Sequence, residues 1–352
     1  LPFGMGGGAG TVVTAMKDAG VDFIATCMDL NGMKTLAQEL ERQLGVLVLP
    51  VFWTASEDHD WEEVNHTYLG VERDGVRRVQ LPGGPQYPLP MSDVLVGDGA
   101  RIVLEEISDI LVDNSDSGVL LKWIQEAYRP ENSVSDAFAA LLGRMLGPFD
   151  FCTTEAWHPA VKRSSAGVLL EGVERSDAHE KLLRERTRAV EAAGYHGQVA
   201  VLDGATNVFR HGPEGRERIY TSPEGYRTAA GGPTVGLAEL KAEIERNPGA
   251  FSPNVLLRPV VESTVFPTVA YVGGPGELSY FAQISALFPA FGIEPPMVFP
   301  RASLLLLEMP MRRLLEKLGI EPERLSQPRH ELVEQLARGS VPDRVPSILE
   351  KL

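Results

Sequence analysis

Apolar and polar positions between residues 21 and 53 follow a pattern that predicts a strand, a helix and a second strand. Residues 21–27 are apolar and partly β-branched, as in a strand. Residues 46–53 are apolar throughout, which indicates a strand covered on both faces in a parallel sheet. The polar residues after Trp53 are therefore expected at the carboxyl end of a strand, where open α/β sheets bind ligands. Between the strands, a helix is predicted from the apolar positions Met33, Leu36, Ala37, Leu40 and Leu44, ending at Gly45.

Later segments predict further hairpins and helices. Turn residues at Asp74-Gly75 and around Gly212-Pro213-Glu214-Gly215 predict hairpins over 71–81 and 208–220, and a Pro- and Gly-rich link spans 82–90. A strand over 269–272 precedes the tight loop 273–276. One charged amphipathic helix over 176–193 is expected to be capped by Ser176 and ended by Gly194. Other helices are predicted over residues 101–112, 136–146, 237–246, 277–291, 312–318 and 331–338.

This succession of elements predicts an α/β protein with a parallel-sheet core that carries inserted hairpins. We expect the core to span residues 1–310, with insertions near 70–92 and 199–225, and residues 311–352 to form a helical tail. A length of 352 residues, of which 43% are hydrophobic and 23% charged, is sufficient for such a core.

Charge and cysteine content exclude several classes of protein. A formal net charge of −15 does not favour binding to nucleic acid or to an anionic membrane, because both require a basic surface. Cys27 and Cys152 lie far apart without metal-type spacing, which favours a reducing compartment. No apolar run reaches the ~18 residues of a membrane span, and the start, Leu1-Pro2-Phe3-Gly4, shows no signal peptide. We therefore expect a cytoplasmic protein.

A dense group of polar residues, 56–66, directly follows the second predicted strand. It contains four ionisable residues in a row, Glu57, Asp58, His59 and Asp60. Asp60, with Glu63 three residues later, resembles a capping box, so part of the group has a structural explanation. A histidine among carboxylates serves either as a general base or as a donor that stabilises charge. Both roles remain open at this point.

A metal site is the competing interpretation of the same segment. If a helix begins near Asp60, then His59, Glu63 and His66 fall near one face, and they could ligate a metal. The spacing differs from the His-Glu-x-x-His zinc pattern, so we expect no bound metal. The corresponding alternative function is a metal-dependent hydrolase.

A second candidate site is the glycine-rich loop Gly273-Gly274-Pro275-Gly276-Glu277, between a predicted strand and a predicted helix. Glycines allow the backbone to approach a ligand closely, and a helix N-terminus offers free N–H groups to phosphate or carboxylate. The loop matches neither a Walker A motif nor a dinucleotide fingerprint, and a purely structural turn is the alternative.

Several isolated polar residues stand in apolar or turn contexts. An arginine beside a buried run usually pairs with a carboxylate of the protein or of a ligand. The residues concerned are Tyr195, His196, Gln198, Asn207, Arg258, Tyr271, Arg301 and Ser303.

Together these segments resemble the bacillithiol-biosynthesis cysteine-adding enzymes, the BshC family. The similarity covers roughly residues 44–352 in the family's order, and residues 1–43 are atypical for it. The combination is specific, although each segment alone is not. The matching stretches are Pro50-Val51-Phe52-Trp53, Glu57-Asp58-His59-Asp60, Glu63-Val64-Asn65-His66, Tyr195-His196-Gly197-Gln198-Val199, Thr206-Asn207-Val208-Phe209, Phe251-Ser252-Pro253-Asn254-Val255-Leu256-Leu257-Arg258-Pro259, Thr268-Val269-Ala270-Tyr271-Val272-Gly273-Gly274-Pro275-Gly276-Glu277 and Pro300-Arg301-Ala302-Ser303.

The resemblance implies a Rossmann-like core with inserted connecting peptides and a ligase that adds cysteine to glucosaminyl malate, the last step in making the low-molecular-weight thiol bacillithiol. ATP or ADP is the candidate nucleotide. His59 and Asp60 would then lie nearest the chemistry, with Asp58 and Glu57 holding the amine or positioning His59. The glycine-rich loop, Arg258 and Arg301 would bind carboxylates. The remaining expected substrate-binding residues are Ser56, Asn65, His66, Tyr195, His196, Gln198, Asn207, Tyr271 and Ser303.

The resemblance also implies a coiled coil near the C-terminus that joins two subunits in full-length relatives. The helical patterns after Pro310 do not hold the three or four heptads of a coiled coil and correspond to its start. We therefore expect this chain to be monomeric or weakly self-associating. A catalytically inactive, small-molecule-binding remnant is the non-enzyme alternative.

Overall fold

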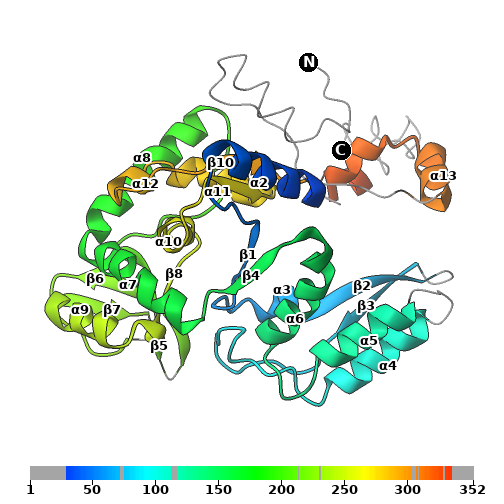
Figure 1. Cartoon of the computed structure of the whole chain (residues 1–352), viewed down its shortest axis with the longest axis horizontal. Coiled ribbons are helices and arrows are strands. Elements are labelled where there is room, and N and C mark those ends of the chain that lie inside the picture. Colours follow the sequence, from blue (N-terminus) through cyan, green and yellow to red (C-terminus); the bar gives the residue numbers. More distant parts are fainter. Residues whose placement is uncertain are drawn as a thin grey trace, which may run out of the picture. The chain divides into compact units, whose positions relative to one another are not determined.

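The computed structural model describes residues 29–71, 75–111, 117–212, 214–229, 231–302, 307, 309–327 and 330–334. The chain divides into two compact units, residues 1–302 and residues 303–352. The larger unit combines helices with parallel and antiparallel strand pairs, which confirms the predicted α/β class (Figure 1). The strand expected over residues 21–27 lies outside the described residues, as does Cys27.

The first described helix forms where the periodicity placed it, but the strand after it is shorter than predicted. Helix α2 spans Leu30–Leu44, and Gly45 ends it in the left-handed conformation. Strand β1 covers only Val51–Thr54 and pairs in parallel with β4, Cys152–Glu155, which the sequence pattern did not reveal. The predicted strand over 46–53 is confirmed for residues 51–53, in a parallel pair, but residues 46–50 lie outside it, and the expectation that this apolar run is covered on both faces is wrong. Its exposed residues are Val46 (55%), Leu47 (69%), Leu49 (50%) and Val51 (41%).

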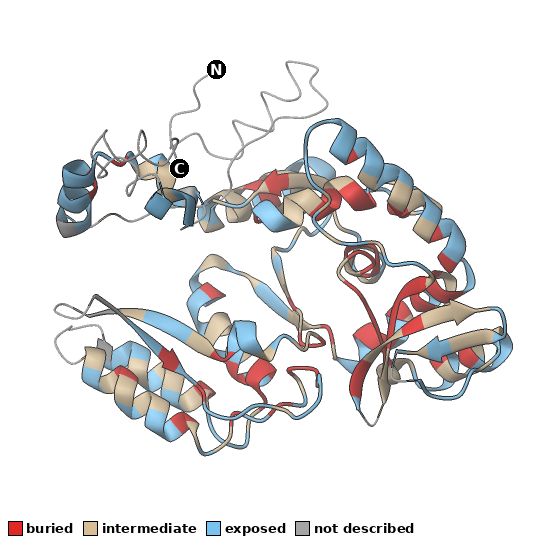
Figure 2. Ribbon diagram, turned by 180° about the vertical axis from the view of Figure 1, so that it is seen from behind, coloured by how far each residue is buried: buried red, intermediate tan, exposed pale blue. Residues whose placement is uncertain are grey.

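The largest hydrophobic core surrounds a four-stranded antiparallel sheet in the order β7-β6-β5-β8. Figure 2 shows buried residues gathered in α10 and in the strands and helices near it. The β5–β6 pair confirms the second predicted hairpin, and α9 confirms the predicted helix over 237–246. The elements are β5 (Ala205–Gly212), β6 (Gly215–Ser222), β7 (Gly225–Thr228), β8 (Phe251–Pro253), α7 (Pro159–Glu174), α8 (Ser176–Ala192), α9 (Leu237–Arg246), α10 (Arg258–Val265) and the 3-10 turn η2 (Pro248–Ala250).

The start of α8 differs from the prediction that Ser176 caps it. Helix α7 leads into α8 with only Arg175 between them, so Arg175 occupies the cap position and makes no side-chain capping bond. Ser176 is instead the first helical residue and is buried. Ser176 resembles a free helix start in the sequence because the apolar pattern does not reveal α7 before it.

A second, smaller core belongs to the inserted hairpin and the helices that follow it. The antiparallel pair β2–β3 confirms the first predicted hairpin, and α4 and α5 lie side by side next to it (Figure 1). Leu81, Met91, Val94 and Ala137 are among its buried residues. The elements are α3 (Trp61–Val64), β2 (His66–Val71), β3 (Gly75–Gln80), α4 (Ala100–Leu111), α5 (Ser117–Ala127), α6 (Val134–Leu146) and the 3-10 turn η1 (Gly147–Phe149).

Strands β9 (Ala270–Gly273) and β10 (Met297–Pro300) form another parallel pair. Helices α11 (Pro275–Ile284) and α12 (Leu287–Ala290) lie between these strands in the sequence. Leu36 of α2 packs against Phe299 of β10 in a third hydrophobic cluster. The helix predicted over 277–291 therefore begins earlier, at Pro275, and is interrupted before Leu287.

The smaller unit is described only in part. Helix α13 spans Met309–Leu318, where a helix over 312–318 was predicted, and a 3-10 turn, η3, spans Pro322–Ser326. Residues 330–334 are helical, and the rest of the helix predicted over 331–338 lies outside the described residues. Leu315 is buried, whereas Leu314 and Leu318 are exposed.

Glycine is required at position 215, at the turn of the β5–β6 hairpin, because of the backbone conformation there and the close approach of Pro88. Its φ is +92°, and a Cβ atom there would lie 2.7 Å from the carbonyl oxygen of Pro88. Gly215→Ala is expected to lower the free energy of unfolding by about 1–3 kcal/mol, measured by urea denaturation. Gly212→Ala is the matched control, because a Cβ there meets no atom closer than 3.9 Å. Equal stability of the two variants would contradict the prediction.

Candidate functional site

Loop 55–60, at the carboxyl end of β1, is held in place by hydrogen bonds from several segments. The Ser56 hydroxyl accepts a bond from the backbone N–H of Trp157 at 3.1 Å. The backbone N–H of Met91 donates to the carbonyl of Asp58 at 2.8 Å. Ser56 and Glu57 are 2% and 3% exposed. The polar segment found in the sequence is therefore a fixed loop rather than a solvated surface.

Glu57 forms an ion pair with Lys162, from the first turn of α7. Both side chains are 4% exposed, and Lys162 also donates to the carbonyl of Phe251 at 2.5 Å. Its ammonium nitrogen lies 4.6 Å from the ring centre of Trp157. Burial lowers the pKa of Lys162, and the neighbouring Glu57 carboxylate opposes that shift. Glu57 is thus committed to an internal partner.

Asp58 contacts two arginines from distant parts of the chain. It forms an ion pair with Arg258, the first residue of α10, and lies 3.5 Å from Arg216 on β6. Arg258 directly follows a turn in which the Asn254 side chain accepts bonds from the N–H groups of Leu256 and Leu257. Arg258 thus pairs with a carboxylate of the protein, whereas the family resemblance implied that it binds a ligand carboxylate.

His59 lies against Arg216 and the ring of Phe209. Its Nδ1 atom is 3.2 Å from an Arg216 guanidinium nitrogen, and its ring centre is 6.1 Å from that of Phe209. Burial and the positive charge of Arg216 lower the pKa of His59, while Asp60 and Asp58 oppose this. His59 is consequently neutral near pH 7.

Asp60 is the exposed member of the four ionisable residues. It occupies the N-cap position of α3, but its side chain makes no capping bond, so the predicted capping box does not form. The Asp60 carboxylate forms no hydrogen bond or ion pair within the described ranges and is available to a ligand.

The trio proposed as metal ligands does not come together as expected. Helix α3 ends at Val64, and His66 begins β2, so His59, Glu63 and His66 do not share a helix face. In the described part of the chain, no three His, Cys, Asp or Glu residues form a group that could hold a metal ion. The metal-dependent hydrolase therefore loses its geometric basis.

Elemental analysis of the purified protein is accordingly expected to find no stoichiometric zinc, iron or manganese. One equivalent of metal that is retained through purification and lost in His66→Ala would contradict this expectation and restore the hydrolase interpretation.

The glycine-rich loop is occupied by the protein's own carboxylate. Glu277 accepts a bond from the Gly274 N–H at 2.6 Å and another from the Tyr271 hydroxyl at 2.9 Å. A carboxylate at the first turn of α11 neutralises the N-terminal charge that would attract a phosphate. The Gly274 N–H is therefore not free for an anion, whereas the binding of an anion, including a nucleotide phosphate, by the other loop N–H groups stays a prediction.

Arg301 and Gln198 lie beside the same loop. A Cβ atom at Gly274 would be 2.7 Å from the Arg301 guanidinium, and one at Gly276 would be 3.8 Å from the Gln198 amide nitrogen. The structure therefore brings Tyr271, Gly273, Gly274, Glu277, Arg301 and Gln198 together. Arg301 is exposed and is the cation near this loop that can reach a ligand carboxylate.

Glu262, on α10, interacts electrostatically both with Glu57 and Arg258 at the charged loop and with Glu277 at the glycine-rich loop. Burial raises the pKa of Glu262 to about 8, while Arg258 opposes the shift and Glu277 and Glu57 add to it. At neutral pH its carboxyl group is therefore largely protonated. It leaves Arg258 with Asp58 as its charged partner.

Other expected substrate residues have structural roles or lie apart from the charged loop. Asn65 bonds to His66 at 3.0 Å, and Asn207 accepts from Asn254 at 2.9 Å, which supports the turn before Arg258. Tyr195 is 74% exposed, and His196 pairs with Gln198 at 3.0 Å. Ser303 lies outside the described residues.

Two cations of the site, Lys162 and Arg216, were missed by the sequence reasoning. Lys162 sits in a helix that was not predicted, so it carried no local signal. Arg216 and Arg218 did carry one, because arginines two residues apart on a strand share a face. Both guanidinium groups stack on Phe209, with distances of 4.2 and 4.5 Å to the ring centre.

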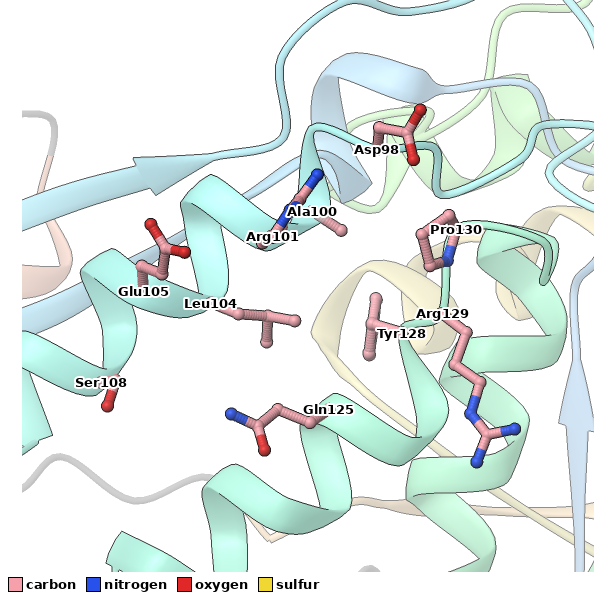
Figure 3. A pocket seen from close by; sticks show the side chains of 10 residues that line it. All are labelled: Asp98, Ala100, Arg101, Leu104, Glu105, Ser108, Gln125, Tyr128, Arg129 and Pro130. Carbon is pink, nitrogen blue, oxygen red and sulfur yellow. The ribbon is translucent and has the colours of Figure 1, made fainter.

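A surface cavity of about 490 Å³ lies elsewhere, between α4 and α5 (Figure 3). Its charged side chains, such as Arg101, Glu105 and Arg129, are exposed, and none of the expected site residues lines it. We therefore assign no catalytic role to this cavity. None of the described helices combines the length and apolar character needed to cross a bilayer.

This chain is similar to known proteins. The family described as "Bacillithiol biosynthesis BshC, N-terminal Rossmann-like domain" matches residues 32–302. A Koribacter versatilis protein named "Putative cysteine ligase BshC" is 32% identical over 307 residues, which is 87% of this chain and 56% of that protein. Proteins of the same name from Salinibacter ruber and Bacillus cereus are 30% and 28% identical, over 81% and 78% of this chain and 52% and 51% of their own lengths. The chain thus spans about half the length of these relatives.

Proposed function

This chain belongs to the BshC family and has its Rossmann-like domain, and on that premise we propose that it joins the cysteine carboxyl group to the amine of glucosaminyl malate. This amide-forming reaction would be the last step of bacillithiol synthesis. The site would be loop 55–60 with the cations around it.

The distribution of charge at this loop supports the proposal. Glu57 and Asp58 are paired internally with Lys162, Arg216 and Arg258, so the inner part of the site has more cations than carboxylates. An excess of largely desolvated positive charge favours an anionic ligand such as malate or the cysteine carboxylate. Asp60, exposed and unpaired within the described residues, can hold an ammonium group.

His59 is suited to stabilise the charge that develops during amide formation. The attacking amine produces a tetrahedral intermediate with a negative oxygen, which needs a positioned hydrogen-bond donor. A neutral, half-buried imidazole beside Asp60 can supply that donor. Of the two roles left open by the sequence, charge-stabilising donor and general base, the contact with Arg216 favours the first.

The reaction also requires activation of the carboxyl group. Joining a free carboxylate to an amine expels water and is unfavourable in water, so a nucleoside triphosphate is the expected co-reactant. In the glycine-rich loop the Gly274 N–H is already bonded to Glu277, and we assign no step to that loop.

The proposal is tested by incubating the purified chain with cysteine, glucosaminyl malate and ATP, with ATP omitted in parallel. Mass spectrometry should detect a thiol whose mass is the sum of the two substrates less one water. An N-acetylated sugar, whose amine is blocked, should give no product. Binding of glucosaminyl malate without any product would instead support the inactive, small-molecule-binding alternative.

A further inference from the structure

Arg216 has nearly all of its hydrogen-bonding capacity committed to fixed partners. Its Nε atom donates to the Ser252 hydroxyl at 3.0 Å, and one terminal nitrogen donates to the carbonyl of Pro253 at 2.6 Å. The other terminal nitrogen lies 3.5 Å from Asp58 and 3.2 Å from Nδ1 of His59. The side chain is 4% exposed and stacks on Phe209. Arg216 therefore has little freedom to turn away from His59.

The chemistry of this contact determines where the proton of His59 resides. A guanidinium group donates hydrogen bonds and cannot accept them, so Nδ1 of His59 must be the acceptor. A neutral imidazole carries its single proton on the other nitrogen when one nitrogen accepts. The contact is consequently compatible only with the tautomer that has its proton on Nε2.

We propose that Arg216 is a positioning residue that fixes His59 as the neutral Nε2–H tautomer and thereby presents a hydrogen-bond donor to the ligand. The tautomer is a property of the free protein. Its catalytic consequence rests on the proposed function.

The charged groups around His59 come from three segments. Asp58 and Asp60 lie on its own loop, Arg216 and Arg218 on β6, and His211 on β5. Burial and Arg216 outweigh the two carboxylates and lower the pKa of His59. Burial also lowers the pKa of His211, to about 3, so that this neighbour is neutral and adds no charge at pH 7.

This arrangement separates the role of His59 from that of a general base. A base must offer an unprotonated nitrogen to the substrate, whereas here the nitrogen that lacks a proton already faces Arg216. The remaining Nε2–H group can donate to a developing oxyanion or to a ligand carboxylate.

The tautomer is measured by nitrogen-15 NMR of the full 352-residue chain without substrates. The His59 signals are assigned by their loss in His59→Gln. The wild-type chain should show His59 neutral at pH 7 with its proton on Nε2. This measurement requires no Arg216 variant, so it stands even if such a variant does not fold.

Two matched variants test whether Arg216 is the cause. Arg216→Met should populate the Nδ1–H form and raise the pKa of His59, because a donor and a positive charge are lost. Arg218→Met removes a neighbouring guanidinium that also stacks on Phe209. Because Arg218 donates to the carbonyl of Thr206 and not to His59, the tautomer of His59 should be unchanged.

Three outcomes would overturn the inference: a wild-type His59 protonated on Nδ1, an Arg216→Met spectrum identical to the wild type, or the same change in Arg218→Met. If the tautomer is as expected but no ligation is found, the proposed function fails and the positioning role of Arg216 stands. In an active protein, Arg216→Met should lower kcat more than it raises KM, since the donor acts in the transition state.

Discussion

Replacing His59 with alanine is expected to slow ligation by at least ~100-fold, the loss that follows removal of one oxyanion donor or one acid/base group. His59 lies at the carboxyl end of β1 with its Nδ1 atom bound to Arg216, so its other nitrogen is the one left for substrate. Asp60→Asn should cause a comparable loss, because Asp60 is the exposed carboxylate next to it. Steady-state rates of product formation by mass spectrometry measure both effects.

The matched control is Glu63→Gln, which removes an exposed carboxylate from the same segment. Its activity should remain within about twofold of the wild type. A substitution at an exposed position that makes no buried contact usually has little effect on a protein. Near-wild-type turnover by both His59→Ala and Asp60→Asn would contradict the assignment of the site. A strong loss in Glu63→Gln would point back to the metal-binding trio.

Replacing Lys162 with methionine should lower the free energy of unfolding by about 3–5 kcal/mol, because it leaves the Glu57 carboxylate buried without its partner. Lys162 and Glu57 are each 4% exposed, so water cannot compensate for the loss. Urea denaturation followed by circular dichroism measures the change. The double variant Lys162→Met/Glu57→Leu should recover much of the stability, because the uncompensated charge is removed as well.

An exposed ion pair provides the control for this comparison. Lys241 pairs with Glu174 at 3.0 Å, and the two side chains are 33% and 47% exposed. Lys241→Met should change the stability by no more than about 1 kcal/mol. If Lys162→Met proved as mild as Lys241→Met, the Glu57–Lys162 pair would not be the buried contact described above.

Local periodicity was sufficient to predict several elements of the fold. The helix over 237–246 matches α9 at both ends, because its apolar positions bury one face and Asn247-Pro248-Gly249 stops it. Both hairpins were predicted from their turn residues, and Gly75 and Gly215 begin the second strand of each hairpin. These signals are local and do not depend on distant residues.

Very short strands escaped the sequence analysis for a physical reason. Strands β4 and β10 have four residues each, too few for alternation to stand out, and they are strands because β1 and β9 pair with them. The opposite error concerned residues 46–50, where an apolar run without a described partner strand stays exposed. Hydrophobicity alone did not reveal whether a neighbour covers it.

In the candidate site, too, the sequence identified what is contiguous and did not reveal contacts between distant segments. Glu57, Asp58, His59 and Asp60 are contiguous, so the sequence alone identified them as a polar group after a strand. Their partners are distant in the chain: Lys162 lies 105 residues beyond Glu57, and Arg216 lies 158 residues beyond Asp58.

The sequence by itself determined the α/β class, the family resemblance and the loop that carries the ionisable residues, because each rests on local periodicity or on contiguous motifs. Only the tertiary structure decided the state of those residues. Burial of Glu57 against Lys162, the pairing of Asp58 with Arg216 and Arg258, and the contact that directs the proton of His59 depend on segments joined by folding. Charge and protonation follow from distance and desolvation, which the order of residues does not specify.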